Sequence, residues 1–66
     1  MSVAKTSEIS ASSSKSFEDA IRRGIKKMSE TVENIEGAWV KEQKVVVKDN
    51  EIDEFRVTIK VTFVVK

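Results

Sequence analysis

Trp39 and Arg56 are the two side chains that most clearly point to ligand chemistry. The flat indole of Trp39 can stack on a planar molecule, and aromatic stacking adds about 0.5–1.5 kcal/mol beyond burial. The guanidinium of Arg56 can bind a carboxylate, a phosphate or a carbonyl edge through forked hydrogen bonds. Each residue also has a structural alternative. Trp39 would pack against a helix or a neighbouring subunit, and Arg56 would form an intersubunit salt bridge with Glu42, Glu54 or Glu51.

A short acidic segment offers a second kind of chemistry. Its carboxylates could bind calcium, which prefers oxygen ligands. The segment lacks the glycine at the sixth position and the glutamate at the twelfth position of an EF-hand loop, because the twelfth residue is Lys60. We therefore interpret it as a solvated hairpin turn. The acidic residues are Asp49, Glu51, Asp53 and Glu54.

Composition narrows the classes of function. The chain has 66 residues, a formal net charge of +1, 35% charged residues, and no Cys or His. Disulfides, Cys/His zinc sites and catalysis by His or Cys are therefore excluded, and we expect a binding protein, not an enzyme. The balanced charge argues against a nucleic-acid partner, which requires a basic excess. No apolar run reaches the roughly 20 residues of a membrane span, and the N-terminus lacks a signal peptide's apolar core, so we expect a cytoplasmic protein with no membrane partner.

Residues 55–65 alternate between apolar and polar side chains, which is typical of a long strand with one buried face. At about 3.4 Å per residue, this strand is roughly 35 Å long. A domain of this size buries only about 60% of its unfolded surface. One copy cannot cover such a strand, so we predict that the chain associates with other copies of itself. The apolar set is Phe55, Val57, Ile59, Val61, Phe63 and Val65.

The sequence predicts one helix. It begins after Ser16, a good N-cap residue, with Asp19 three residues further on as in a capping box. Its apolar stripe continues at helical spacing to Ile35, and we expect the helix to end within residues 34–37, where an Asn or a Gly can adopt a left-handed conformation. Gly24 in its middle is either a tolerated cost or a sign of close approach by the sheet or a neighbouring backbone.

The remaining segments predict two more strands and a turn. Residues 3–11 form a weak first strand. Residues 38–47 form a second strand, whose alternation breaks around 42–44 and predicts a bulge there. Residues 48–51 form a hairpin turn. The predicted fold is α+β, a single domain over residues 1–66 with the order β-α-β-β and a three-stranded antiparallel sheet wrapped around one helix.

Three stretches, taken in order, match a known pattern. Residues 16–21 read Ser-Phe-Glu-Asp-Ala-Ile, residues 40–43 read Val-Lys-Glu-Gln, and residues 55–63 read Phe-Arg-Val-Thr-Ile-Lys-Val-Thr-Phe. With these stretches the sequence resembles the dodecins over nearly its full length. The resemblance implies a hollow homododecamer with helices outside and sheets inside, and in many members of the family such a shell binds flavins.

Two positions depart from the flavin-binding pattern. Flavin-binding dodecins carry a Trp three positions before the Val of Val-x-Glu-Gln, and it stacks on the flavin. They also carry a Gln after the first aromatic of the closing strand, and it bonds the pyrimidine edge of the flavin. In this sequence these positions are Gly37 and Arg56. An Arg at the second position also resembles a branch of the family that binds calcium instead of flavin.

The resemblance implies a storage function. Flavin (riboflavin, FMN or FAD) would be held between subunits, with the ring stacked on Trp39 near Gly37 and its edge held by Arg56 with Glu42 or Gln43. The alternative is a flavin-free oligomer of the same shape that binds ions such as calcium or is purely structural. A third interpretation is a small adaptor that offers a strand edge to a partner.

Overall fold

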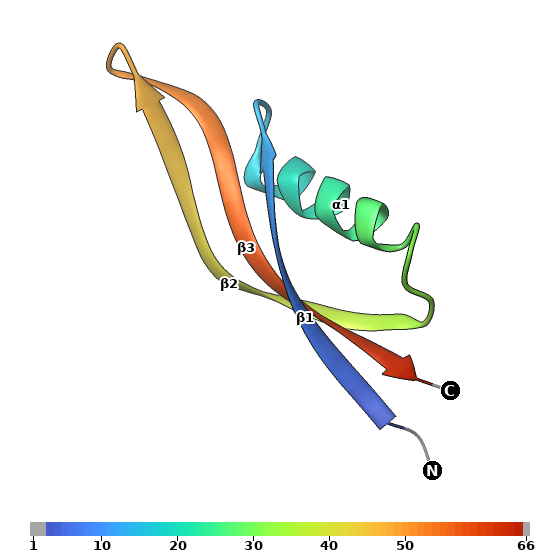
Figure 1. The fold of residues 1–66 in the computed structure, drawn as a ribbon. Helices are drawn as coiled ribbons and strands as arrows, with labels where there is room; N and C mark the ends of the chain where they lie inside the picture. The colour runs from blue at the N-terminus through green and yellow to red at the C-terminus, as the bar shows by residue number, and fades with distance from the viewer. Residues whose placement is uncertain (1–2, 66) are drawn as a thin grey trace.

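The structure, a computed structural model, describes residues 3–65 and contains one antiparallel sheet with a single helix on one side (Figure 1). The sheet has the order β1-β3-β2, so the last strand lies in the middle and pairs with both others. This confirms the predicted β-α-β-β order and three-stranded sheet. Residues 1, 2 and 66 of the predicted domain lie outside the described residues. The elements are β1 (Val3–Ser13), α1 (Phe17–Met28), β2 (Ile35–Lys48) and β3 (Glu51–Val65).

The core forms where the apolar side of β3 meets the helix. Val57, Ile59 and Val61 of β3 and Ala20 of α1 are buried. Side chains of a strand alternate between its two faces, so the polar residues between these positions point away from the helix. The alternation predicted for the last strand is confirmed here. Partly buried apolar side chains complete the core: Ile9, Ala11, Phe17, Ile21, Ile25, Met28 and Ile35.

The start of the helix is as predicted, but its end is not. Ser16 is the N-cap, and its hydroxyl accepts a 2.9 Å hydrogen bond from the backbone N–H of Asp19. The helix ends at Met28, well before the predicted end in residues 34–37. At this end the hydroxyl of Ser29 donates to the carbonyl of Lys26 and that of Thr31 to the carbonyl of Met28, at 2.6 and 3.3 Å. Such side-chain bonds to backbone groups compete with continued helix.

The residues expected to end the helix belong to the next element. Asn34 has a φ of 62° and is left-handed, as predicted for one of the two candidates, but it lies in the connection after the helix. Ile35, predicted to lie on the apolar stripe of the helix, begins β2 and still packs against the core. Gly37 lies within β2 and has no positive φ. Ile35 therefore contacts the core, as the apolar stripe predicts, although it lies in a strand and not in the helix.

β2 carries a bulge that decides which of its residues share a face. Its register with β3 shifts between Val40 and Glu42, which leaves Lys41 as the extra residue. The predicted bulge at 42–44 is therefore present but begins earlier in the strand. Because of the shift, Trp39 and Glu42 lie on the same side of the sheet although they are three positions apart in the sequence. In a regular strand an odd separation would place them on opposite sides.

Gly24 allows the helix to approach the sheet closely. It is buried, and a Cβ atom added there would lie 3.1 Å from the Cβ of Ala11 and 3.4 Å from Cδ1 of Ile59. The Cβ of Ala11 is fixed to the β1 backbone and cannot rotate away. Of the two explanations that the sequence left open, the close approach by the sheet is therefore the one that the packing supports.

We predict that Gly24→Val destabilises the fold by about 1–3 kcal/mol, because the added methyl groups would overlap with β1 and β3 in a packed interior. Urea denaturation followed by circular dichroism measures the change in the free energy of unfolding. Lys27→Val is the matched control, since Lys27 is exposed on the same helix and the substitution carries the β-branched penalty without the overlap. Equal stability of the Gly24 variant and this control would show that the helix does not need the small residue.

A polar network ties the end of β1 to the first turn of the helix. The hydroxyl of the buried Ser13 donates a 2.5 Å hydrogen bond to Oδ2 of Asp19 and accepts a 2.9 Å hydrogen bond from the backbone N–H of Lys15. Arg23 binds the same carboxylate oxygen at 2.7 Å. The hydrogen bond from Ser13, followed by that from Arg23, lowers the pKa of Asp19 below its ordinary value of 3.8. The carboxylate of Asp19 thus links β1 to α1, and the Ser13 hydroxyl adds the connection between them.

This network predicts an acid-dependent stability. Because the pKa of Asp19 is lowered by folding, the unfolded chain binds its proton more tightly, and the stabilisation is complete above about pH 4 and lost as the pH falls through the folded pKa. Asp19→Asn should therefore lower the melting temperature at pH 7, and this difference should shrink as the pH falls below about 4. Glu18→Gln is the control, because it removes a charge from the same turn without touching Ser13. A gap between wild type and Asp19→Asn that stays constant from pH 7 to pH 2 would contradict the prediction.

Candidate functional site

The side of the sheet turned away from α1, which we call the open face, carries polar residues in rows across the three strands. Residues paired directly across antiparallel strands share a face, so the register defines each row. The first row is Glu8, Lys60 and Trp39, the second is Ser10, Thr58 and Glu42, and the third is Ser12, Arg56 and Lys44. Within each row, the first residue belongs to β1, the second to β3 and the third to β2.

Trp39 forms a flat, accessible surface at one end of this face. Its side chain lies on the side of the sheet that is turned away from the helix, and 54% of the residue is exposed. The ammonium of Lys60 lies over the ring, 5.4 Å from the ring centroid. Within the described chain Trp39 therefore does not pack against the helix, which was one of its two structural alternatives. A ring in this position is open to a planar ligand or to a second subunit.

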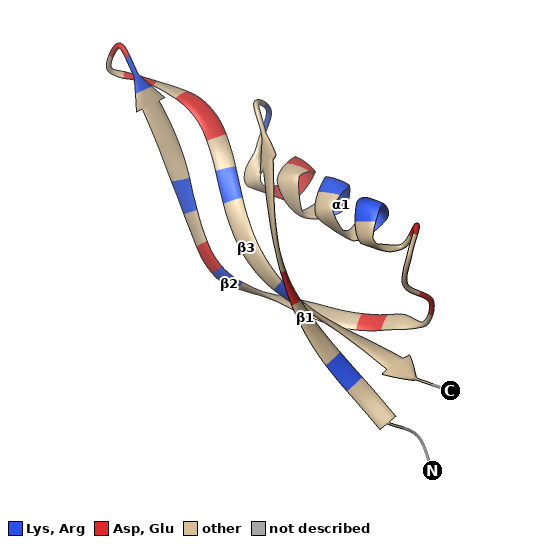
Figure 2. Ribbon diagram, viewed as in Figure 1, with Lys and Arg blue, Asp and Glu red and all other residues tan. Residues whose placement is uncertain are grey.

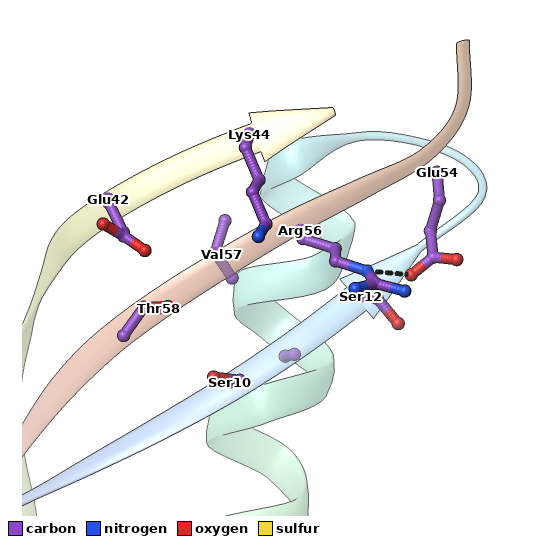
Figure 3. A pocket seen from close by; sticks show the side chains of 9 residues that line it. Ser10, Ser12, Glu42, Lys44, Glu54, Arg56, Val57 and Thr58 are labelled. Atoms are coloured by element: carbon purple, nitrogen blue, oxygen red, sulfur yellow. Dashed lines mark hydrogen bonds and ion pairs between the residues drawn. The ribbon is translucent and has the colours of Figure 1, made fainter. Parts of the chain in front are cut away.

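Arg56 lies in a shallow pocket of about 390 Å³ two rows away from Trp39 (Figure 3). Its Nε donates a 2.7 Å hydrogen bond to Oε1 of Glu54. This contact lowers the pKa of the Glu54 carboxyl and raises the pKa of the Arg56 guanidinium, so both groups keep their charge. Arg56 therefore has a partner within its own chain, and this partner, Glu54, is one of the three acids of the sequence-based alternative. The polar lining of the pocket is Ser10, Ser12, Glu42, Lys44, Glu54, Arg56 and Thr58.

The structure brings together four of the five predicted site residues and separates the fifth. Gly37, Trp39, Glu42 and Arg56 share the open face. Gln43 pairs with Val57, whose side chain is buried under the helix, so Gln43 lies on the opposite side of the sheet from Trp39 and Arg56. Consecutive residues of a strand alternate in direction, so Glu42 and Gln43 cannot both reach the same pocket from one chain.

Sequence reasoning missed two lysines of this site. Lys44 lies directly opposite Arg56, and Lys60 lies directly opposite Trp39. Two cations paired across strands repel one another unless an anion lies nearby, and here Glu54 occupies one side of Arg56. Only the register could have revealed these pairs, because each joins residues that are distant in the sequence. The even spacing of Lys60 and Arg56 was the one sequence signal that they share a face.

Gly37 leaves a gap on the same face. It pairs with Thr62 in the row beyond Trp39, and a Cβ atom added to it would meet no atom within 4 Å. Because its φ is not positive, other residue types can adopt its backbone conformation. The position at which the family's aromatic residue would stand is therefore open, and Trp39 projects from the same strand two residues further on.

The acidic segment forms the tight turn between β2 and β3. Asp49 and Asn50 have φ values of 53° and 62°, as expected of short polar residues in such a turn. Asp53 lies 3.7 Å from Nζ of Lys48, and Glu54 is bound to Arg56. Within residues 3–65, acidic side chains form no group of three or more that could hold a metal ion. In the same part of the chain, no helix has the length and apolarity needed to cross a membrane.

Comparisons with known proteins agree with this architecture. A family model described as Dodecin matches residues 3–66, and the chain therefore belongs to the dodecin family. No curated protein matches the chain. Among solved structures it is similar to a dodecin from Streptomyces davaonensis, with 29% sequence identity, a TM-score of 0.94, and coverage of 98% of this chain and 96% of that chain.

Two more distant structures show the fold alone. An arginine-to-alanine mutant of the T. thermophilus dodecin is 23% identical with a TM-score of 0.95, and the match covers 100% of this chain and 98% of that one. A dodecin from Streptomyces coelicolor is 17% identical with a TM-score of 0.94, covering 98% and 93%. Proteins of low sequence identity thus share this backbone fold. The function of this chain therefore has to be inferred from its own side chains on the open face.

Proposed function

We propose that this dodecin is a cytoplasmic binding protein, not an enzyme, which assembles as a hollow homododecamer and stores flavin between its subunits. Trp39 would stack on the isoalloxazine ring, and Arg56 with Glu42 would hold a polar part of the ligand. Gln43 would reach the ligand only from another subunit, because it lies on the other side of its own sheet. The ligand could be riboflavin, FMN or FAD.

The observation that carries this proposal is the placement of an exposed aromatic ring and a polar pocket, lined by charges of both signs, on one face. Lys60, the partner of Trp39, and Arg56 are four residues apart on β3, a distance of about 14 Å along a strand. A planar ring joined to a polar or phosphorylated chain has a comparable length. Arg56 and Lys44 favour a polar or anionic end, because guanidinium and ammonium groups bind carboxylates and phosphates.

Uncovered apolar side chains support self-assembly. α1 packs on β1 and β3, while several apolar residues of β2 and of the adjoining end of β3 remain exposed. Ile21 and Ile25 of the helix, which also pack against the core, line a second surface groove. Apolar surface left open by such a small chain is best removed from water by further copies. The exposed residues and their exposed fractions are Val40 39%, Val45 38%, Val47 56% and Ile52 57%.

A flavin-free oligomer is the second candidate. It is favoured by the glycine at position 37, which supplies no ring, and by the ion pair of Arg56 with Glu54, which gives the guanidinium a structural role. In this alternative the open face would hold ions such as calcium or only water. Ion binding would require ligands from several subunits, because one described chain gathers no group of three acidic residues.

We predict that the protein quenches the fluorescence of riboflavin and FMN at tens of micromolar, and that Trp39→Ala weakens binding by about two- to tenfold through lost stacking. Trp39→Phe is the matched control that keeps an aromatic ring. Gly37→Trp should bind flavin more tightly, because the position is open and lies on the same face. If neither flavin is quenched by the wild type or by Gly37→Trp, the flavin proposal is wrong. A melting temperature that rises with calcium and falls with a chelator would then favour the ion-binding alternative.

A separate prediction concerns assembly. Light scattering should give a mass about twelve times the 7.4 kDa of one chain. Val45→Glu should reduce this mass, since it places a charge on apolar surface that another copy would bury. Ser14→Glu is the control, because Ser14 is an exposed residue in the connection after β1. A folded wild-type protein with the mass of one chain would refute the shell, and a folded dimer would favour the adaptor interpretation.

A further inference from the structure

Lys60 places a positive charge directly at the aromatic surface of Trp39. The two residues are cross-strand partners on the open face, and the ammonium lies 5.4 Å from the centre of the indole ring. An ammonium in this position is attracted by the negative face of the ring.

The charge of Lys60 is not used in an ion pair within the part of the chain that the structure describes. Glu8 lies opposite Lys60 on β1 and is its nearest candidate by register. The carboxylate of Glu8 instead binds Nζ of Lys41 at 3.2 Å. Lys41 is the extra residue of the β2 bulge. The bulge thus provides a second lysine, Lys41, which binds the carboxylate of Glu8. The ammonium of Lys60 remains over the indole ring.

A planar molecule that stacks on Trp39 must therefore meet this ammonium. It either displaces the lysine from the ring, which places the ammonium beside the ligand, or lies on the other side of the indole, farther from the ammonium than the 5.4 Å to the ring centroid. Charges at such distances interact appreciably even near a protein surface. A ring with negative charge is favoured, and a ring with positive charge is repelled. The side chain of Lys60 can thus select ligands by charge without touching their polar tails.

We propose that Lys60 is a specificity-determining residue of the Trp39 surface, which makes it prefer planar ligands with an anionic or electron-rich ring over cationic ones. This inference rests on the proposed function in placing the ligand at Trp39, but it concerns the charge of the ring and not its identity as a flavin. Arg56 and Lys44 would act on the far end of a ligand, whereas Lys60 acts on the ring itself.

The test uses rings of similar size and opposite charge. Anthraquinone-2-sulfonate is the anionic probe, proflavine the cationic probe and lumichrome the neutral one. Binding is read from the emission of Trp39, the only tryptophan in the chain, corrected for probe absorption with free N-acetyltryptophanamide. Lys60→Gln should weaken binding of the anionic probe and strengthen that of the cationic probe, each by about two- to fivefold. Lumichrome should change least.

Lys48→Gln is the matched control, because it removes the same charge from β2 at the hairpin end of the strand, where the lysine lies beside Asp53 and nine positions away from Trp39. It should leave the ratio of the anionic to the cationic affinity nearly unchanged. Equal shifts for Lys60→Gln and Lys48→Gln would overturn the proposal, as would quenching of Trp39 by none of the three probes. Circular dichroism checks that both variants are folded.

This experiment is independent of the flavin experiment. If flavins bind but the charge of the ring has no effect in Lys60→Gln, the storage function stands and the role of Lys60 is wrong. If flavins do not bind but the anionic probe does, with the predicted dependence on Lys60, the selective surface is real and the flavin proposal is wrong.

Discussion

The packing of one side of β3 against α1 is the constraint on which the rest of the structure depends. Val57, Ile59 and Val61 are buried beneath the helix, and this burial decides the direction of every other side chain of the central strand. Because β3 pairs with both neighbours, it also sets the register of β1 and β2. Arg56 and Lys60 reach the open face for this reason, and their cross-strand partners are brought there with them.

The last strand and the start of the helix were predicted correctly, because a short sequence pattern is enough to define each of them. The alternation of residues 55–65 was sufficient for the last strand, and Ser16 with Asp19 for the start of the helix. The helix end could not be read in the same way, because Ser29 and Thr31 bind the last carbonyls while the apolar spacing continues to Ile35. The family resemblance placed the whole chain in the dodecins, which the family model confirms.

The candidate site was only partly predictable because it is built across strands. Trp39 and Arg56 were found by residue type, but their common face depends on the extra residue Lys41 in β2. Most of β2 is exposed in a single chain, so its hydrophobic pattern gave little information about the position of the bulge. Gln43 was assigned to the site together with Glu42, although the two lie on opposite sides. The spacing of Lys60 and Arg56 in the last strand indicated that they share a face, but the contact of Lys60 with Trp39 required the register.

The position of Trp39 changes the dimensions of the site relative to an aromatic residue at position 37. The shift by two residues moves the ring one row towards Arg56, which shortens the span between ring and guanidinium by about 7 Å. A ligand that uses both groups would therefore be more compact, or more bent, than one held from position 37. The low identity to solved dodecins of the same fold is consistent with such a change in side chains on an unchanged backbone.

The two outer strands of the sheet have a consequence for the behaviour of the chain at high concentration. β1 and β2 each leave one row of backbone N–H and C=O groups unpaired within the sheet, and such edges can recruit further strands into fibres. β2 interrupts this row with three irregularities, after Ile35, Val40 and Val46. Lysines add positive charges along the same strand (Figure 2), at positions 41, 44 and 48. These features disfavour uncontrolled addition of strands, so closed association through side-chain surfaces can prevail over open-ended growth along the edge.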